Sequence, residues 1–167
     1  MEMAMTGAKQ EPQMKSLPAI EVAGLRMNHT IDDHMFVAIG KQWEEFSPMI
    51  ETVPNKKGHS DFGLCFDMTG GHTSFDYMAG VEVSTLDGVK RPLAGIRLRP
   101  KTCAVFAHND HVSRLNETVA KAWQWLRASG RELDANASEP TFIEHYGEKF
   151  DPETGFGDIE IWFPVKA

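Results

Sequence analysis

The chain lacks the excess of positive charge on which nucleic-acid-binding proteins depend. Its 167 residues include 24 acidic and 17 basic side chains, which gives a formal net charge of −7. Such a surface repels a phosphate backbone and favours cationic partners. The sequence therefore predicts no direct binding to DNA or RNA.

Cysteine and long apolar runs are also scarce. Cys65 and Cys103 are far apart and form no C-x-x-C pair, so neither a disulfide framework nor a zinc ribbon is predicted. No stretch approaches the length of a membrane span, and the N-terminus has no apolar signal segment. We expect a cytoplasmic protein without membrane contact, in which a flexible leader of residues 1–16 precedes one domain at 17–167.

Common catalytic and cofactor motifs are missing as well. The chain has no phosphate-binding P-loop, no dinucleotide fingerprint and no serine elbow. His108 and His111 suggest a metal site, with Asp33 and His34 as further ligands, but both clusters lie where a strand turns into a helix. A helix cap at Asp110 and histidines on the surface explain them without a metal. The sequence predicts no metal, no cofactor and no catalytic residue.

The chain does contain an internal repeat with a constant offset of about 80 residues, which composition alone rarely produces. Apolar residues of similar size coincide between halves at about 17–87 and 95–167. The coincident pairs are Ile39 and Val119, Gly40 and Ala120, Trp43 and Trp123, Phe46 and Leu126, Phe62 and Phe142, Phe66 and Tyr146, Val81 and Ile161, and Val83 and Phe163.

Each half has the pattern strand, helix, strand, strand. In the first half a helix with apolar residues at three- and four-residue steps begins after an N-cap at Thr30 and ends at Pro48, and in the second half a helix follows Asp110. Period-two segments predict the strands at 19–28, 61–67, 74–84, 102–108, 141–146 and 158–165. We predict an α+β fold: an antiparallel sheet with two helices and pseudo-two-fold symmetry between the halves.

Positions where the two copies differ are candidates for function, because an asymmetric ligand needs a residue in only one copy. Glu160 coincides with Gly80, and Glu144 coincides with Leu64. Strand periodicity places Glu160 beside Trp162 on one face, away from the aliphatic residues of that strand. A carboxylate beside an indole can neutralise and stack on a cation.

Three further residues join this candidate site. Glu144 and Tyr146 share a face of the preceding strand, and Tyr77 comes from the first half. Solvated glutamates and packed aromatics would explain the same pattern. If Glu160 does lie in an apolar pocket, burial should raise its pKa. The candidate binding residues are Glu160, Trp162, Glu144, Tyr146 and Tyr77.

Six fragments, in this order and spacing, resemble the effector-binding domain of bacterial AraC-type and MerR-type regulators, also called the gyrase-inhibitory-protein-like domain. They are Val22–Arg26, Phe75–Val83, Ala104–His108, Trp123–Gly130, Phe142–Tyr146 and Ile159–Val165. The resemblance covers the chain from about Leu17 to its end. It implies the duplicated fold and a hydrophobic pocket between the halves, where a glutamate receives lipophilic cations; Glu160 matches that position, and Glu144 matches a second recurrent glutamate.

The resemblance also sets the functional alternatives. Regulators of this family carry a helix-turn-helix module ahead of the domain, whereas only about sixteen residues precede it here. A stand-alone binding protein, similar to those of integron cassettes, is therefore the first expectation, and it would not be an enzyme. The main alternative is a hydrolase of strained cyclopropane-containing electrophiles, in which a pocket glutamate activates water. A third is contact with a protein partner such as gyrase or a separate DNA-binding regulator.

Overall fold

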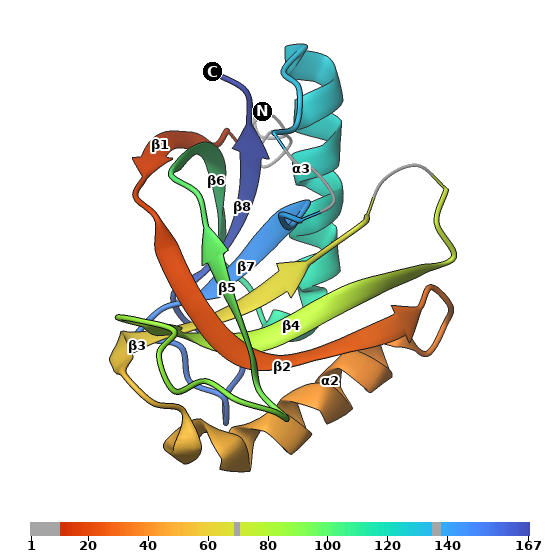
Figure 1. Ribbon diagram of the computed structural model, residues 1–167. Helices are drawn as coiled ribbons and strands as arrows, with labels where there is room; N and C mark the ends of the chain where they lie inside the picture. Colours follow the sequence, from red (N-terminus) through yellow and green to blue (C-terminus); the bar gives the residue numbers. More distant parts are fainter. Residues whose placement is uncertain (1–10, 69–70, 135–137) are drawn as a thin grey trace.

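The computed structural model describes residues 11–68, 71–134 and 138–167. Within these residues, eight strands form a single antiparallel sheet in the order β1-β6-β8-β7-β3-β4-β2-β5, with helix α2 beneath it and α3 along one side (Figure 1). The strands are β1 (Gln13–Leu17), β2 (Ile20–Thr30), β3 (Lys56–Cys65), β4 (Ser74–Val83), β5 (Ala94–Leu98), β6 (Lys101–His108), β7 (Phe142–Tyr146) and β8 (Ile159–Val165). The helices are α2 (Met35–Phe46) and α3 (Leu115–Ser129), with short 3-10 helices η1 (Ser47–Thr52) and η2 (Val112–Arg114).

The predicted α+β fold and its duplication are confirmed. Strands β2, β3 and β4 with helix α2 repeat as β6, β7 and β8 with helix α3, and β3 and β7 join the two halves at the centre of the sheet. Edge strands β5 and β1 complete the halves on opposite sides. The two copies are therefore related by a pseudo-two-fold axis at the β3–β7 pair.

Two short connections force the sheet to curl. Leu17 ends β1 and Ile20 begins β2, so the link between them spans at most about 11 Å. In a flat sheet these two strands would lie about 29 Å apart, because five strands separate them. The link from Leu98 in β5 to Lys101 in β6 imposes the same constraint. The sheet is consequently a half-barrel whose two ends approach each other.

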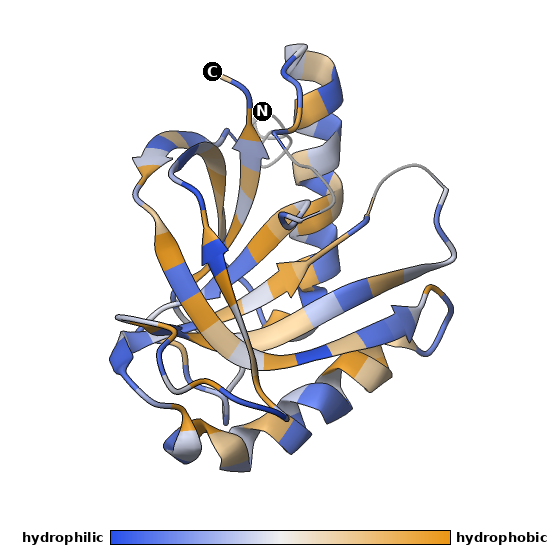
Figure 2. Ribbon diagram, in the orientation of Figure 1, coloured by the Kyte–Doolittle hydropathy of each residue, from blue (hydrophilic) through white to orange (hydrophobic). Residues whose placement is uncertain are grey.

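The curled sheet buries a different hydrophobic cluster on each face. Both helices cover one face and form the helix-side core, which includes Phe46, Tyr77, Phe106, Phe142, Ile161 and Phe163. The other face forms an inner cluster to which central and outer strands of the sheet contribute, including Val22, Phe62, Leu64, Met78, Leu98, Val105 and Trp162. The middle of β2 is largely hydrophobic and its end is mostly hydrophilic (Figure 2). Val22 joins the inner cluster and Ala23 joins the helix-side core, because successive side chains point to opposite faces.

The helices occupy the predicted places but begin later than predicted. Thr30 is not a helix cap: it pairs with Ser74 in the sheet, and α2 begins at Met35. Asp110 does not cap a helix either; the ring of His111 accepts the backbone N–H of Ser113 at the start of η2. Longer strands and the intervening η2 displaced both starts. In the described chain, neither helix is long and apolar enough to cross a membrane.

The predicted leader is wrong over residues 13–16, whereas residues 1–10 lie outside the described residues. Residues 13–17 form β1, which pairs antiparallel with residues 101–105 of β6. An edge strand can be held by backbone hydrogen bonds without an alternating apolar pattern. Strand β5, at the other edge of the sheet, was not predicted either: Ile96 and Leu98 alternate with exposed residues there, but the strand is only five residues long.

The constant repeat offset fails in the two central strands. Phe62 belongs to the inner cluster, whereas Phe142, its coincident residue, belongs to the helix-side core. Phe66 and Tyr146 are divided between the faces in the same way. Because strand faces alternate with period two, a residue of β3 and its counterpart on the same face of β7 must be an odd number of positions apart in the sequence, and not 80. Glu144 therefore has no structural counterpart in Leu64.

Candidate functional site

Glu144 lies near the middle of the sheet, on the face that the helices cover. It belongs to β7, directly opposite Gly63 of β3, so it stands at the junction of the two halves. Its neighbours Phe142 and Tyr146 point to the same face and join the helix-side core. Glu144 itself keeps part of its surface accessible to solvent. The fold thus places one carboxylate inside an aromatic core, with a route to solvent.

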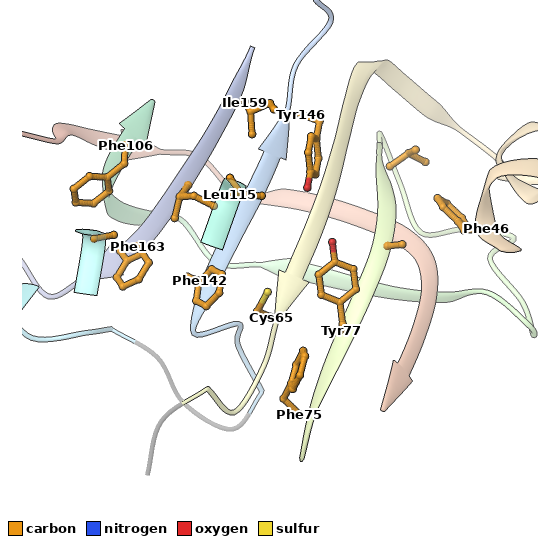
Figure 3. Packing of buried hydrophobic residues seen from close by; sticks show 14 of the residues in the cluster. Phe46, Cys65, Phe75, Tyr77, Phe106, Leu115, Phe142, Tyr146, Ile159 and Phe163 are labelled. Atoms are coloured by element: carbon orange, nitrogen blue, oxygen red, sulfur yellow. The ribbon is translucent and has the colours of Figure 1, made fainter. Parts of the chain in front are cut away.

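One carboxylate oxygen of Glu144 accepts two phenol hydroxyls. Tyr77 donates to Oε1 at 2.6 Å and Tyr146 donates to the same atom at 2.9 Å. Figure 3 shows the two hydroxyls pointing toward one another from different strands. The indole Nε1–H of Trp43, in α2, donates to the Tyr77 hydroxyl at 2.9 Å. These four residues form a connected group, which we call the Glu144 site.

Burial controls the protonation of the Glu144 site. Desolvation raises the pKa of Glu144, although the hydrogen bonds from Tyr77 and Tyr146 oppose the rise. Burial, with the Glu144 charge as the next cause, also raises the pKa of Tyr77 and of Tyr146 well above the usual tyrosine value. The thiol of Cys65, 4.0 Å from Oε2, has a raised pKa for the same two reasons. The tyrosines and the thiol are therefore neutral donors, and only Glu144 can supply charge.

Gly63 leaves the space that the carboxylate and the phenol occupy. A Cβ atom at this position would collide with the Tyr77 hydroxyl and with Oε1 of Glu144. Gly63 is paired with Glu144 across the strands, where facing side chains are closest. A glycine in the interior of a strand often marks such a close approach.

Sequence reasoning missed two residues that build this site. Trp43 coincides with Trp123 in the repeat, which is typical of a core position; it does pack against the core, but it also bonds to Tyr77. The buried amide of Gln42 donates to the backbone carbonyls of Leu25 and Tyr77 and so fixes α2 to the sheet. A polar Gln42 on the buried side of an amphipathic helix was the available signal.

Glu160 and Trp162 lie on the other face of the sheet, away from the Glu144 site. Oε1 of Glu160 accepts the indole N–H of Trp162 at 2.9 Å and lies 3.3 Å from Nδ1 of His145. The ring of His145 stacks on Trp162 with the centroids 4.7 Å apart. The predicted rise in the pKa of Glu160 is wrong: the hydrogen bond with His145 lowers it, against the effect of burial.

The five predicted site residues therefore divide into two groups. Glu144, Tyr146 and Tyr77 come together, whereas Glu160 and Trp162 form a separate group on the opposite face. The alternation within each strand was predicted correctly. The sequence did not show which strand pairs with β8; in the structure it is β7, which places His145 directly opposite Glu160.

The predicted surface histidines are wrong for His108. Its ring is buried, with Nδ1 2.6 Å from the Thr118 hydroxyl and Nε2 2.8 Å from the carbonyl of His111. It therefore connects the end of β6 to the start of α3. In the described part of the chain, no three His, Cys, Asp or Glu side chains gather as metal ligands would.

Two cavities lie elsewhere. One of about 250 Å³ is lined by η1 and the loop at 88–93, and one of about 10 Å³ lies beside the inner cluster; Glu144 lines neither. Tyr77, Tyr146 and Trp43 pack around Glu144, so a large ligand there would have to displace side chains, and of these three Trp43 is only partly buried. Chemically, the site offers a negative charge, two phenols and an indole.

Comparison with known proteins identifies a family. A family model described as the GyrI-like small molecule binding domain matches residues 10–166. No curated protein matches the chain significantly by sequence.

Solved structures show the same fold at low sequence identity. SAV2435 bound to tetraphenylphosphonium is 18% identical, with a TM-score of 0.71 and coverage of 94% of each chain. The C-terminal domain of EcmrR is 17% identical, with a TM-score of 0.68 over 94% of this chain and 98% of that one. An integron cassette protein from the mobile metagenome of Vibrio cholerae is 17% identical, with a TM-score of 0.65 over 94% and 97%. Since the family model spans nearly the whole chain, this protein belongs to the GyrI-like family of small-molecule-binding domains.

Proposed function

We propose that this domain binds lipophilic organic cations at the Glu144 site, between the two helices. The observation that carries the proposal is the convergence of the Tyr77 and Tyr146 hydroxyls, at 2.6 and 2.9 Å, on one oxygen of a carboxylate in an aromatic core. Neutral donors hold the carboxylate in place without cancelling its charge. A ligand with delocalised positive charge can supply the missing counter-charge.

The charge of Glu144 gives the preference for cations. Its raised pKa reflects the cost of an ionised carboxylate in these surroundings. A nearby cation offsets that cost, because charges in a partly dry site attract more strongly than in water. An anion would add repulsion. The site should therefore discriminate by charge.

Aromatic side chains give the preference for greasy ligands. The ring of Trp43 meets the rings of Tyr146 and Tyr77 edge-on, with centroid distances of 5.8 and 6.5 Å. Trp43 therefore lies over both phenols, and we infer that it swings aside to admit a ligand. Aromatic faces attract cations, and burial of apolar surface sets few demands on shape. The structure of SAV2435 with tetraphenylphosphonium, which shares this fold, is in keeping with such a ligand.

Titration calorimetry with tetraphenylphosphonium and with neutral triphenylphosphine oxide tests the proposal. Glu144→Gln keeps the shape and removes the charge, so it should weaken the cation by about ten-fold or more and leave the neutral compound nearly unchanged. Glu160→Gln is the matched variant for the carboxylate on the opposite face. Loss of cation affinity in Glu160→Gln, with wild-type affinity in a folded Glu144→Gln, would transfer the recognition to Glu160 and refute the proposal.

A second function uses the same carboxylate. Glu144 has a raised pKa and lies within hydrogen-bonding distance of two phenols, an arrangement in which the carboxylate could activate water and a phenol could donate a proton. The substrate class would be strained electrophiles such as cyclopropane-containing compounds. Incubation with such a compound and chromatography of the products separates the alternatives: a ring-opened product that disappears in Glu144→Gln would establish an enzyme.

A further inference from the structure

Ser60, His145 and Glu160 form a hydrogen-bonded chain on the face of the sheet opposite the Glu144 site. The Ser60 hydroxyl lies 3.1 Å from Nε2 of His145, and Nδ1 of the same ring lies 3.3 Å from Oε1 of Glu160. The three residues come from three neighbouring strands, β3, β7 and β8. A hydroxyl, an imidazole and a carboxylate in this order are the parts of an activated serine nucleophile.

The carboxylate determines which ring nitrogen of His145 carries the proton. Ionised Glu160 can only accept, so Nδ1 of His145 must be the N–H that faces it. Nε2 then has a lone pair directed at the Ser60 hydroxyl. The neutral ring can therefore accept the serine proton, which is the tautomer that a general base needs.

Trp162 holds this arrangement in place. Its indole N–H donates to Oε1 of Glu160 at 2.9 Å, and its ring stacks on His145 with an interplanar angle of 27°. The ring of Phe62 lies against the other two rings, 5.1 Å from that of His145 and 5.7 Å from that of Trp162. Glu160 and Trp162 are positioning residues, because they act through His145.

The nucleophile is accessible and stands beside irregular backbone. Ser60 is partly exposed, and the side chains of His145 and Glu160 are 17% and 25% exposed, so a small molecule can reach the hydroxyl from solvent. In the register between β3 and β4, the five steps from Lys56 to Asp61 face only two steps of β4. The bulge at 57–60 therefore interrupts the regular pairing of β3 with β4 beside Ser60.

We propose that Ser60, His145 and Glu160 form an acyl-transfer site that takes small, unhindered esters from solvent. Ser60 Oγ attacks the ester carbonyl while its proton passes to Nε2 of His145, and the electron pair of the carbonyl moves to its oxygen. A backbone N–H of the bulge at 57–60 would stabilise that oxyanion. When the tetrahedral intermediate collapses, the ester C–O bond breaks and the leaving alcohol takes the proton from His145.

Water completes the cycle. It attacks the acyl-Ser60 carbonyl, gives one proton to His145 and releases a carboxylic acid, and His145 returns the proton to Ser60. No other reactant is required. Ser60 must reach the carbonyl carbon directly, so acetyl-sized groups should react, and branched acyl groups, which shield that carbon, should react poorly.

Labelling with a fluorophosphonate probe, followed by peptide mapping, tests the nucleophile. We expect one label on the peptide containing Ser60, none on that peptide in Ser60→Ala, and labelling at least ten-fold slower in His145→Gln. Ser113→Ala is the matched control: Ser113 also bonds to a histidine, His111 at 2.8 Å, but in the described part of the chain no carboxylate bonds to the ring of His111. Ser113→Ala should therefore label at the wild-type rate.

Hydrolysis of 4-nitrophenyl acetate and of the hindered pivalate tests the turnover and the positioning role. Glu160→Gln keeps an acceptor for Trp162, so it should fold normally, lower kcat by ten-fold or more for the acetate and leave KM nearly unchanged. Pivalate should react poorly with every variant. An unlabelled Ser60 in folded wild-type protein, or labelling as fast in His145→Gln as in wild type, would overturn the proposal, and neither result bears on cation binding at Glu144.

Discussion

A pair of glycine-to-alanine substitutions tests the architecture of the Glu144 site with opposite expected signs. Gly63 is buried in β3, where an added Cβ collides with the Tyr77 hydroxyl and with Oε1 of Glu144. Gly40 is exposed in the middle of α2, where an added Cβ meets no atom within 4 Å. The chemical change is identical at both positions, so only the surroundings can separate their effects.

The expected magnitudes follow from these surroundings. An extra methyl group in a well-packed core costs about 1–3 kcal/mol, and loss of a hydrogen bond to a charged group adds about 1.5–3 kcal/mol. We expect Gly63→Ala to lower the free energy of unfolding by about 2.5–6 kcal/mol and to impair cation binding. Gly40→Ala should raise it by about 1 kcal/mol, because alanine has the higher helix propensity.

Urea denaturation followed by circular dichroism measures both changes in the free energy of unfolding. If the m-value, the slope of that free energy against urea concentration, is the same in wild type and variants, the midpoints of their unfolding transitions can be compared directly. A double-mutant cycle with Tyr77→Phe locates the clash, since removal of the hydroxyl should reduce the cost of Gly63→Ala by about 1 kcal/mol or more. If Gly63→Ala changes stability by less than about 0.5 kcal/mol, the close approach of Tyr77, Glu144 and Gly63 described above is wrong.

Two further predictions concern pH and the first strand. Burial raises the pKa of Glu144 in the folded state, so wild type should lose stability relative to Glu144→Gln as pH rises above the usual glutamate value of 4.5. The difference in stability should level off once Glu144 is ionised in the folded state. Thermal melts from pH 4 to 8 measure this difference, and a difference that is independent of pH would contradict the raised pKa. Over the same range, affinity for a permanent cation should rise and then level off. Truncation before Pro18 should lower the melting temperature by several degrees relative to truncation before Gln13, because it removes the backbone pairing of β1 with β6, and equal melting temperatures would show that β1 adds no stability.

The sequence by itself determined the fold class, the duplication and the faces of individual strands. Phe46 and Leu126, which coincide in the repeat as apolar residues, both lie in the core, and period-two alternation correctly separated Glu160 and Trp162 from Ile161 and its aliphatic neighbours. The alternation is a local signal, since it depends only on residues a few positions apart in one strand. Edge strand β1 gives no such signal, because it is held mainly by backbone pairing, and the alternation in edge strand β5 extends over only five residues.

Only the tertiary structure decided which carboxylate lies in the helix-side core and what surrounds each one. Strand order brings Tyr77 to Glu144 and Ser60 to His145, although 67 and 85 residues separate them in the chain. Residues of β3 and β7 that are 80 positions apart lie on opposite faces of the sheet, and not on the same face as a constant repeat would require. The pairing of these two strands places Glu144 opposite Gly63. The chemistry of a carboxylate depends on its burial and on its hydrogen-bond partners, and here each carboxylate has one partner from its own strand and one from another strand, Tyr77 for Glu144 and His145 for Glu160.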